Sequence, residues 1–209
     1  KNTPSSFFSH NYFDTMLVYH RRPTINVLDK ANVIQEGLRL SYPEIGLITG
    51  GHFPSGYDHD RNQCIIGEGL ATFEKARELI QQFEHFPKAW AFVHSNTIPQ
   101  QGNSVSVSFY QLGLWWVNGA RIIKVIDQPT YYGFSYGTLT NHVEYGEELF
   151  FTELLPTSNV VYGIHAYSRP RFWGARLFKP YTRSQQRRFV LESMERMKQH
   201  CRTYATTTP

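Results

Sequence analysis

The chain has few cysteines, no long apolar run and no long run of one charge. Its two cysteines, Cys64 and Cys201, have the spacing of neither a metal site nor a redox motif, so we expect free thiols in a reducing compartment. No apolar stretch approaches the ~20 residues that span a bilayer, and the first residues lack a signal-peptide core. We therefore expect a cytoplasmic protein. Because the chain begins with Lys1, a preceding targeting segment is left open.

The signatures of metal, nucleotide and nucleophile sites are also missing. The histidines never occur as H-x-H or H-x-x-x-H, and "GHFPSGYDHD" fits a polar loop better than a metal site. "GEGLATF" does not match G-x-G-x-x-G, and there is no P-loop or nucleophile elbow. We expect neither metal nor cofactor. The net charge of +4 is spread over short basic groups such as Arg21-Arg22, which disfavours nucleic acid as a partner.

Aromatic residues, by contrast, are abundant. They make up 15% of the 209 residues, which suits a β-rich domain with an aromatic interior. Residues 1–40 have no sustained periodicity and are too few for a separate core, so they predict an N-terminal arm, packed on the domain or partly extended. We expect a single domain over residues 41–204 and a disordered tail over 205–209.

The periodicity of the apolar residues predicts the order of the elements. Residues 42–50 are typical of a first strand and residues 52–63 of a loop. A helix follows, with apolar residues three and four apart at Leu70, Phe73, Ala76, Ile80 and Phe83. About six strand-like runs with short gaps then indicate an antiparallel meander. A last helix has the apolar stripe Val190, Met194, Met197 and Cys201.

This order predicts an α+β fold. A curved antiparallel sheet of about six to seven strands would wrap around the long C-terminal helix. The concave side of such a sheet leaves an internal cavity under the helix, and aromatic side chains would line it.

The stretch "YYGFSYGTLTNHVEYGEELF", residues 131–150, combines three glycines and three glutamates with strand-like text. Glycine weakens strands and buried carboxylates are costly, so these residues need a reason. With "GEGLATFEKARELIQQFEHFPKAW", "GLWWVNGARIIKVID", "AYSRP" and "YTRSQQRRF", it resembles the family catalogued as domain of unknown function 1990, found in bacteria and plants. The match in order and spacing extends over about residues 42–200. Its most specific marker, Y-G-T-L-x-x-H-x-x-x-G-E-E, runs from Tyr136 to Glu148.

The resemblance implies a fold similar to the helix-grip proteins of the START and pollen-allergen type. Those proteins bind lipids, sterols, polyketides or other apolar ligands in the cavity, and a few catalyse cyclisation or dehydration there without a cofactor. The chain departs from the family pattern in two places. Thr140-Asn141 replace the usual Pro-Gly before the histidine, which indicates a differently built turn. Residues 1–40 have no family counterpart, so they are free to cover the cavity mouth or to make a contact of their own.

Glu147 and Glu148 are the first candidates for catalysis. Neighbours on a strand point to opposite faces, so at most one of the two faces the cavity, and the sequence does not say which. A carboxylate buried beside aromatic rings would have a raised pKa and serve as general acid or base. The competing interpretation is a structural ion pair with Arg121 or Arg169, or an exposed strand edge.

Two histidines complete the candidate catalytic set. His142 lies in the predicted turn, where it either shuttles protons or caps the turn through the backbone. His165 lies within a predicted strand and would pair with a glutamate if its face is the cavity face. Otherwise it is a core or exposed histidine.

The candidate ligand contacts are mainly aromatic. One of Trp115 and Trp116 should be buried in the core, and the other should form either a ligand platform or a partner surface. Arg169 would either anchor a ligand carboxylate or form a salt bridge with a glutamate. The predicted set is Tyr136, Tyr167, Trp115, Trp116, Phe134 and Arg169.

The leading functional hypothesis is binding of a hydrophobic or amphipathic small molecule in the aromatic cavity. The alternative is a cofactor-independent lyase, isomerase or cyclase that acts on such a ligand by acid/base catalysis. A third hypothesis is an interaction or membrane-surface module that uses the basic C-terminal helix, Arg183 to Lys198. A homodimer is left open.

Overall fold

The computed structural model describes residues 17–171 and 179–207. Its elements, in chain order, are β1 (Leu17–Tyr19), α1 (Ile25–Glu36), the 3-10 helix η1 (Ile48–Gly50), β2 (Asp58–Glu68), α2 (Gly69–Gln81), β3 (Ala91–His94), β4 (Ser104–Gln111), β5 (Leu114–Gln128), β6 (Tyr131–Thr138), β7 (Glu144–Leu154), β8 (Asn159–Pro170) and α4 (Lys179–Thr207).

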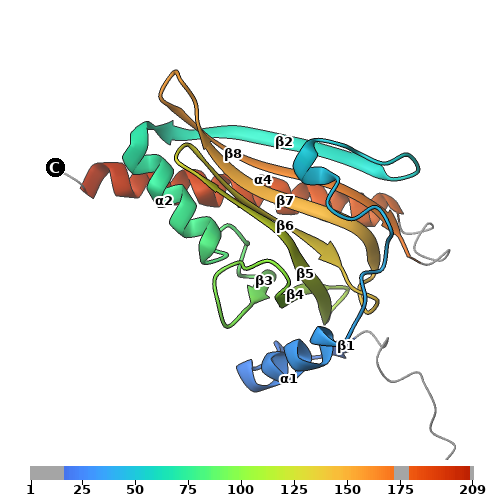
Figure 1. Ribbon diagram of the computed structural model, residues 1–209. Coiled ribbons are helices and arrows are strands. Elements are labelled where there is room, and N and C mark those ends of the chain that lie inside the picture. Colours follow the sequence, from blue (N-terminus) through green and yellow to red (C-terminus); the bar gives the residue numbers. More distant parts are fainter. Residues whose placement is uncertain (1–16, 172–178, 208–209) are drawn as a thin grey trace, which may run out of the picture.

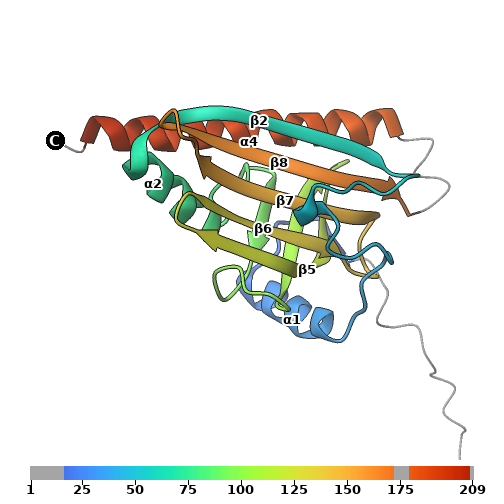
Figure 2. The same ribbon diagram turned by 45° about the horizontal axis from the view of Figure 1, so that its top comes forward.

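The strands form one curved antiparallel sheet. The order is β2-β8-β7-β6-β5-β4-β3, and β1 adds a short pairing with β5. The long helix α4 lies along the concave side next to β2 and β8, and α2 packs at one end of that side (Figures 1 and 2). This confirms the predicted α+β arrangement of a curved sheet around a long C-terminal helix.

The first long strand lies later in the sequence than we expected. Residues 42–50 form no strand but contain η1, whereas the expected loop holds most of β2. β2 is an edge strand that pairs with β8 along most of its length, and its residues alternate between exposed and half-buried. An edge strand accepts polar side chains because backbone pairing rather than burial holds it. This is why "DHDRNQ" gave no apolar signal.

Residues 40–57, which we call the strap, cover the convex face of the sheet. Tyr42, Ile48 and Tyr57 from the strap are buried there against a second apolar cluster whose sheet members are Leu149, Phe151, Val161 and Tyr167. Both faces of β7 and β8 are therefore covered, one by the strap and one by the concave core.

Two glycines of the 131–150 stretch are explained by the close approach of other parts of the chain. A Cβ atom at Gly137 would lie 2.0 Å from the hydroxyl oxygen of Tyr42. Gly146 has φ +147°, and a Cβ atom there would lie 1.9 Å from the carbonyl oxygen of Tyr167. Any side chain at either position would displace the strap or the neighbouring strand.

Residues 17–36 pack on the sheet near β4 and β5. Leu28 and Ala31 of α1 contact Phe92, Trp115 and Val117. Residues 1–16 of the predicted arm lie outside the described residues. At the other terminus α4 extends to Thr207, so it includes part of the segment for which we expected a disordered tail. Residues 208–209 lie outside the described residues.

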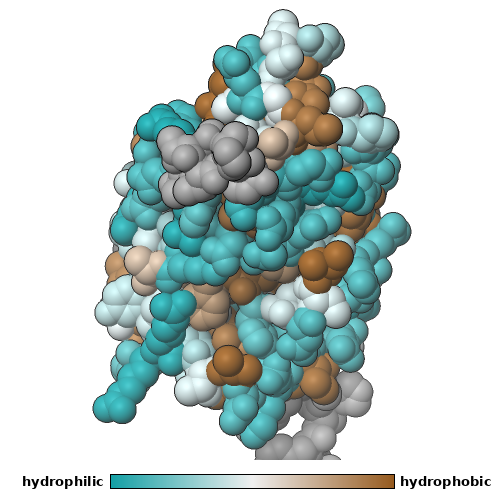
Figure 3. Space-filling model, turned by 90° about the vertical axis from the view of Figure 1, so that its left-hand side faces the viewer, coloured by the Kyte–Doolittle hydropathy of each residue, from teal (hydrophilic) through white to brown (hydrophobic). Residues whose placement is uncertain are grey.

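The concave core is filled only at the end where α2 lies. The predicted stripe of α4 is confirmed, since Met197 and Cys201 are buried there and Val190 and Met194 pack against the core. The large rings of Phe73, Phe86, Phe134, Phe150 and Tyr162 fill the remaining space at this same end. The surface over this end is mostly hydrophilic, with small separate apolar patches (Figure 3). Both cysteines are free thiols, and no helix in the described ranges is long and apolar enough to cross a membrane.

Candidate functional site

A cavity of about 540 Å³ lies between the concave face of the sheet and the N-terminal half of α4. This volume is within the range of roughly 300–1,000 Å³ that small-molecule sites occupy. One part of its wall is apolar and mainly aromatic, formed by Trp90, Phe109, Trp116, Tyr136, Ile164 and Phe189. Leu112 of the β4–β5 turn and Leu191 of α4 also line it, and both are about 70% exposed.

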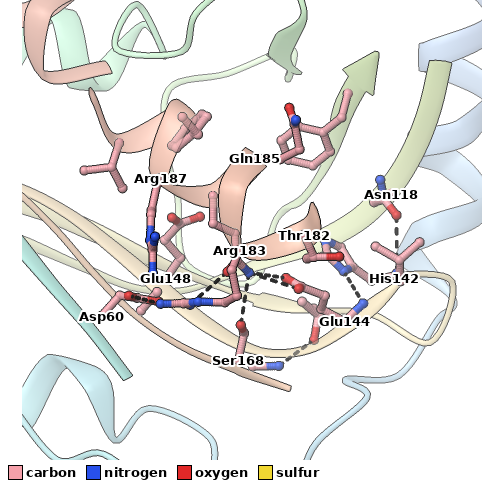
Figure 4. Close-up of a pocket in the computed structure, with 18 of the residues that line it drawn as sticks. Asp60, Asn118, His142, Glu144, Glu148, Ser168, Thr182, Arg183, Gln185 and Arg187 are labelled. Carbon is pink, nitrogen blue, oxygen red and sulfur yellow. Dashed lines mark hydrogen bonds and ion pairs between the residues drawn. The ribbon is translucent and has the colours of Figure 1, made fainter. Parts of the chain in front are cut away.

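The register of four strands places the polar part of the wall. Tyr136 on β6 pairs with Glu148 on β7, Glu148 pairs with Ala166 on β8, and Ala166 pairs with Asp60 on β2. Paired residues share a face of the sheet, so this whole row faces α4. Figure 4 shows Asp60 and Glu148 below α4, with Glu144 and Ser168 beside them.

Glu148 is the candidate acid or base that the structure places in the cavity. The hydroxyl of Tyr136 donates a hydrogen bond of 2.6 Å to Glu148 Oε2. Burial, together with the charges of Glu144 and Asp60, raises the pKa of Glu148 to about 7, although the hydrogen bond from Tyr136 acts in the opposite direction. Burial and the Glu148 charge hold the pKa of Tyr136 well above its usual value. Near neutral pH, Glu148 can therefore both give and accept a proton, and Tyr136 stays a donor.

Glu144 is a second carboxylate of the same wall. Gln186 Nε2 of α4 lies 3.0 and 3.2 Å from its two oxygens and 3.3 Å from Ser168 Oγ. Burial raises the pKa of Glu144 to a net value of about 7, although the Gln186 hydrogen bond and the charge of Arg183 act in the opposite direction. The wall thus contains two carboxyl groups that titrate near neutrality.

Arg183 fixes the start of α4 to the edge strand β2. Its guanidinium donates two hydrogen bonds of 2.5 and 2.6 Å to the two oxygens of Asp60, and a third of 2.8 Å to Gln186 Oε1. Such a two-pronged pair is geometrically specific. Arg183 therefore neutralises Asp60 and positions the amide that holds Glu144.

His142 borders the cavity from the turn between β6 and β7. Its Nδ1 accepts a hydrogen bond of 3.0 Å from the backbone N–H of Glu144, the kind of contact expected of a turn cap. Burial lowers the pKa of His142 to about 4, so the ring is neutral at pH 7 and carries its proton on Nε2. The turn is also held by Asn141, whose Oδ1 accepts from the backbone N–H of Gly119 at 3.1 Å. This bond explains how the turn forms without the usual Pro-Gly.

Glu147 points to the opposite face of the sheet, as parity requires. Its Oε1 accepts hydrogen bonds of 2.6 Å from the hydroxyl of Tyr42 and 2.6 Å from the backbone N–H of Gly46. The ion pair that we considered with Arg121 or Arg169 is replaced by these strap contacts. Arg121 instead donates to backbone carbonyls at the end of α1.

Three other candidates also have their side chains on the convex face. His165 lies against the rings of Phe53 and Phe151. Tyr167 donates a hydrogen bond of 2.5 Å to the carbonyl of Glu44 in the strap. The guanidinium of Arg169 lies 4.6 Å from the ring centre of Tyr57. None of these side chains points toward Glu148.

The remaining aromatic candidates divide between the cavity and the core. Trp116 lines the cavity, and its Nε1 donates to the carbonyl of Gln111 at 3.1 Å. Trp115 points the other way and is buried under α1. Phe134 is fully buried in the filled part of the concave core, where its ring centre lies 5.5 Å from that of Phe150.

Asp60, Glu144, Arg183 and Gln186 were not among the predicted site residues. The helical signal for two of them was present, because Arg183 and Gln186 continue the stripe of Val190 and Met197 at spacings of three and four. Glu144 shares strand parity with Glu148 but is separated from it by Gly146. In the described ranges, no three histidine, cysteine or acidic side chains come together as a metal site.

Comparisons with known proteins agree on family and fold. Residues 41–196 match the family model described as Domain of unknown function (DUF1990). A UPF0548 protein of Dictyostelium discoideum is 33% identical over 156 residues, which cover 68% of this chain and 72% of that protein. A UPF0548 protein of Deinococcus radiodurans is 29% identical over 159 residues, or 71% of this chain and 80% of that protein.

Among solved structures, the di-domain ARO/CYC StfQ from the steffimycin biosynthetic pathway superimposes with a TM-score of 0.50 at 8% identity. The superposition covers 72% of this chain and 52% of that one. Ara h 8.0201 gives a TM-score of 0.45 at 13% identity over 71% of this chain and 99% of that one. At these identities the likeness concerns the helix-grip fold alone. The match to the family model, together with the sequence relatives, shows that the chain belongs to the DUF1990 family.

Proposed function

We propose that this protein binds a hydrophobic or amphipathic small molecule in the cavity under α4. The observation that carries the proposal is the partly open cavity of about 540 Å³ with an aromatic wall on one side and ionisable groups on the other. Moving apolar ligand surface out of water is favourable by about 25 cal/mol per Å². The polar part of the wall fixes the orientation of a ligand whose two ends differ.

A cavity-filling substitution tests this proposal. Ala166 lies on β8 between Glu148 and Asp60 and lines the cavity, so Ala166→Phe puts a ring into the space that the ligand would occupy. We expect the fluorescence of the neutral probe N-phenyl-1-naphthylamine to rise on binding to the wild-type protein. The Ala166→Phe variant should bind it at least about tenfold more weakly.

Ala71→Phe, on the exposed side of α2, is the matched control and should bind the probe like the wild-type protein. Circular dichroism checks that both variants are folded. Failure of the wild-type protein to bind the probe, or equal binding by Ala166→Phe, would rule out the cavity as the binding site.

A second candidate function is acid/base catalysis on the bound molecule without a cofactor. It is favoured by the hydrogen bond of 2.6 Å between Tyr136 and Glu148 and by the pKa of about 7 of that carboxyl group. Glu148 would transfer the proton while Tyr136 orients the substrate, and neutral His142 would donate a hydrogen bond from Nε2. The class of reaction is a lyase, isomerase or cyclase step.

Comparison of co-purified ligands separates a catalyst from a binder. We expect the Glu148→Gln variant to retain unconverted substrate, because the amide cannot exchange protons. Native mass spectrometry and chromatography of the released ligand would show a compound that the wild-type protein then converts. If both proteins release the same compound and the wild-type protein leaves it unchanged, the cavity binds without catalysis.

A surface module built on the basic helix α4 is less well supported. Arg183 pairs with Asp60, Arg188 with Glu192 at 2.7 Å, and Arg196 with Glu84 at 2.8 Å. These intramolecular pairs reduce the positive charge that α4 offers to a membrane or another anionic partner.

A further inference from the structure

The charges of the cavity wall specify the ligand further. We propose that the ligand carries a protonated amine, or another nitrogen cation, that binds against Glu148 while its apolar body lies along the aromatic wall. This inference rests on the proposed binding function and adds to it the chemical class of the ligand's polar end.

The cavity wall contains more acidic than basic side chains. Its carboxylates are Asp60, Glu144 and Glu148, and its guanidinium groups are Arg183 and Arg187. Glu147 also borders the cavity, but its carboxylate contacts the strap on the opposite face. Arg183 is committed to Asp60 through two hydrogen bonds. Arg187 is an exposed residue whose side chain reaches from α4 toward Glu148 (Figure 4). No ion pair between these two residues occurs in the described ranges, and solvent screens the charge of Arg187. A second negative charge from a ligand carboxylate would meet repulsion here, whereas a cation would be attracted.

Glu148 has an open position for such a cation. Its Oε2 accepts the hydrogen bond from Tyr136, and no hydrogen bond to Oε1 is found within the described part of the chain. No salt bridge with Glu148 occurs there either, although Asp60, in the same row of the sheet, has Arg183 as its partner. A partly buried carboxylate without a cation is costly, and a ligand ammonium group would relieve that cost.

The aromatic wall next to Glu148 suits the same ligand. Tyr136, Phe189 and Trp90 line the cavity, and the rings of Phe189 and Trp90 lie 6.3 Å apart. The core residue Phe150 packs behind them, 5.6 Å from the ring of Tyr136 and 6.3 Å from that of Phe189. Aromatic side chains therefore continue from the hydroxyl that contacts Glu148 to the apolar wall. Aromatic rings attract cations at their faces and also bury aliphatic chains. A nitrogen cation with an apolar tail can therefore contact the wall along its whole length.

A displacement experiment with three ligands of equal chain length tests the inference. Dodecylamine, dodecanol and dodecanoate, each below its micelle-forming concentration, compete with bound N-phenyl-1-naphthylamine at pH 8. We expect dodecylamine to displace the probe at a concentration about tenfold or more below that of dodecanol, and dodecanoate to be the weakest. In Glu148→Gln, dodecylamine should lose its advantage over dodecanol. Glu153→Gln, on the opposite face of the same strand, should retain it.

The pH dependence gives a second readout that a change in packing would not produce. Glu148 has to be ionised to bind the cation, and its pKa in the unliganded protein is about 7. The ionisable groups around it include Tyr136 on β6, Glu144 on β7, Tyr162 on β8, Asp60 on β2 and the two arginines of α4. Below pH 7 the advantage of dodecylamine over dodecanol should shrink, because Glu148 becomes neutral while the amine stays protonated.

The outcomes distinguish this inference from the binding function itself. Probe binding with no preference for dodecylamine, or a preference for dodecanoate, overturns the cation site and leaves the binding function standing. Absence of probe binding overturns the binding function. If Glu148→Gln does not fold, Glu148→Asp replaces it, since the shorter carboxylate should keep the sign of the preference and weaken it. An unchanged preference in a folded Glu148→Gln variant contradicts the assignment to Glu148.

Discussion

At the scale of single residues, two adjacent glutamates have unrelated tasks. Glu148 faces the cavity and holds Tyr136, whereas Glu147 faces the strap and holds Tyr42 and Gly46. Gly137 lies opposite Glu147 in the sheet register and leaves room for the Tyr42 hydroxyl. The glycines and glutamates of residues 131–150 therefore make specific contacts on both faces of the sheet.

The Tyr42→Phe substitution tests the role of Glu147 in holding the strap. Removal of the hydroxyl leaves a buried carboxylate oxygen with one hydrogen bond fewer, so we expect the free energy of unfolding to fall by about 1–3 kcal/mol. Urea denaturation measures this change. Tyr110→Phe, at a residue that is 43% exposed, is the control and should stay within about 0.5 kcal/mol of the wild-type protein. Equal stability of the two variants would show that the contact contributes nothing.

Strand parity predicted that only one of these glutamates faces the cavity, and the structure agrees. It did not predict which one, because both faces of β7 carry large apolar side chains, with Phe150 on the concave side and Phe151 on the convex side. That ambiguity comes from the strap, which buries the outer face as well. The same strap separates His165 from Glu148, and a single sequence gives no sign of which face is hollow.

At the scale of elements, the inward face of α4 changes its chemistry along the helix. Met197 and Cys201 pack in the core, whereas Arg183 and Gln186, on the same face about three to five turns earlier, hold the carboxylates of the cavity. The change from apolar to polar side chains marks where the core ends and the cavity begins. Helical spacing alone contained this signal, because all four residues share one stripe.

The strand β2 shows why another part of the fold was missed. Its alternate residues are exposed and its inward residues Asp60 and Asn62 face a polar part of the cavity, so neither face is consistently apolar. Hydrophobic periodicity indicates burial against an apolar core, and few side chains of this strand are buried in that way. Residues 42–50 of the strap were mistaken for a strand for the opposite reason: Tyr42 and Ile48 are buried, but against the outside of the sheet.

At the scale of the whole molecule, burial disfavours the charged forms of two glutamates and two histidines. The two pairs change the stability in opposite directions as pH rises. The pKa values of Glu144 and Glu148 are raised to about 7, so between about pH 4.5 and 7 the folded protein binds more protons at these sites than the unfolded chain does. Burial lowers the pKa values of His142 to about 4 and His85 to about 3, so there the unfolded chain binds more protons below about pH 6.5. As pH rises, the glutamates therefore lower the stability and the histidines raise it.

Removal of one glutamate should expose this balance. We expect the stability of Glu148→Gln, relative to the wild-type protein, to increase as pH rises from 5 to 7, by up to about 1.4 kcal/mol per pH unit, because the variant no longer has a group that resists ionisation in the folded state. Urea unfolding at a series of pH values measures both proteins, with Glu153→Gln as the control for the change of charge. Parallel pH curves for the wild-type protein and Glu148→Gln would mean that Glu148 ionises as readily in the folded protein as in the unfolded chain. In that case the cavity would lack the environment that both acid/base catalysis and the pH-dependent cation site require.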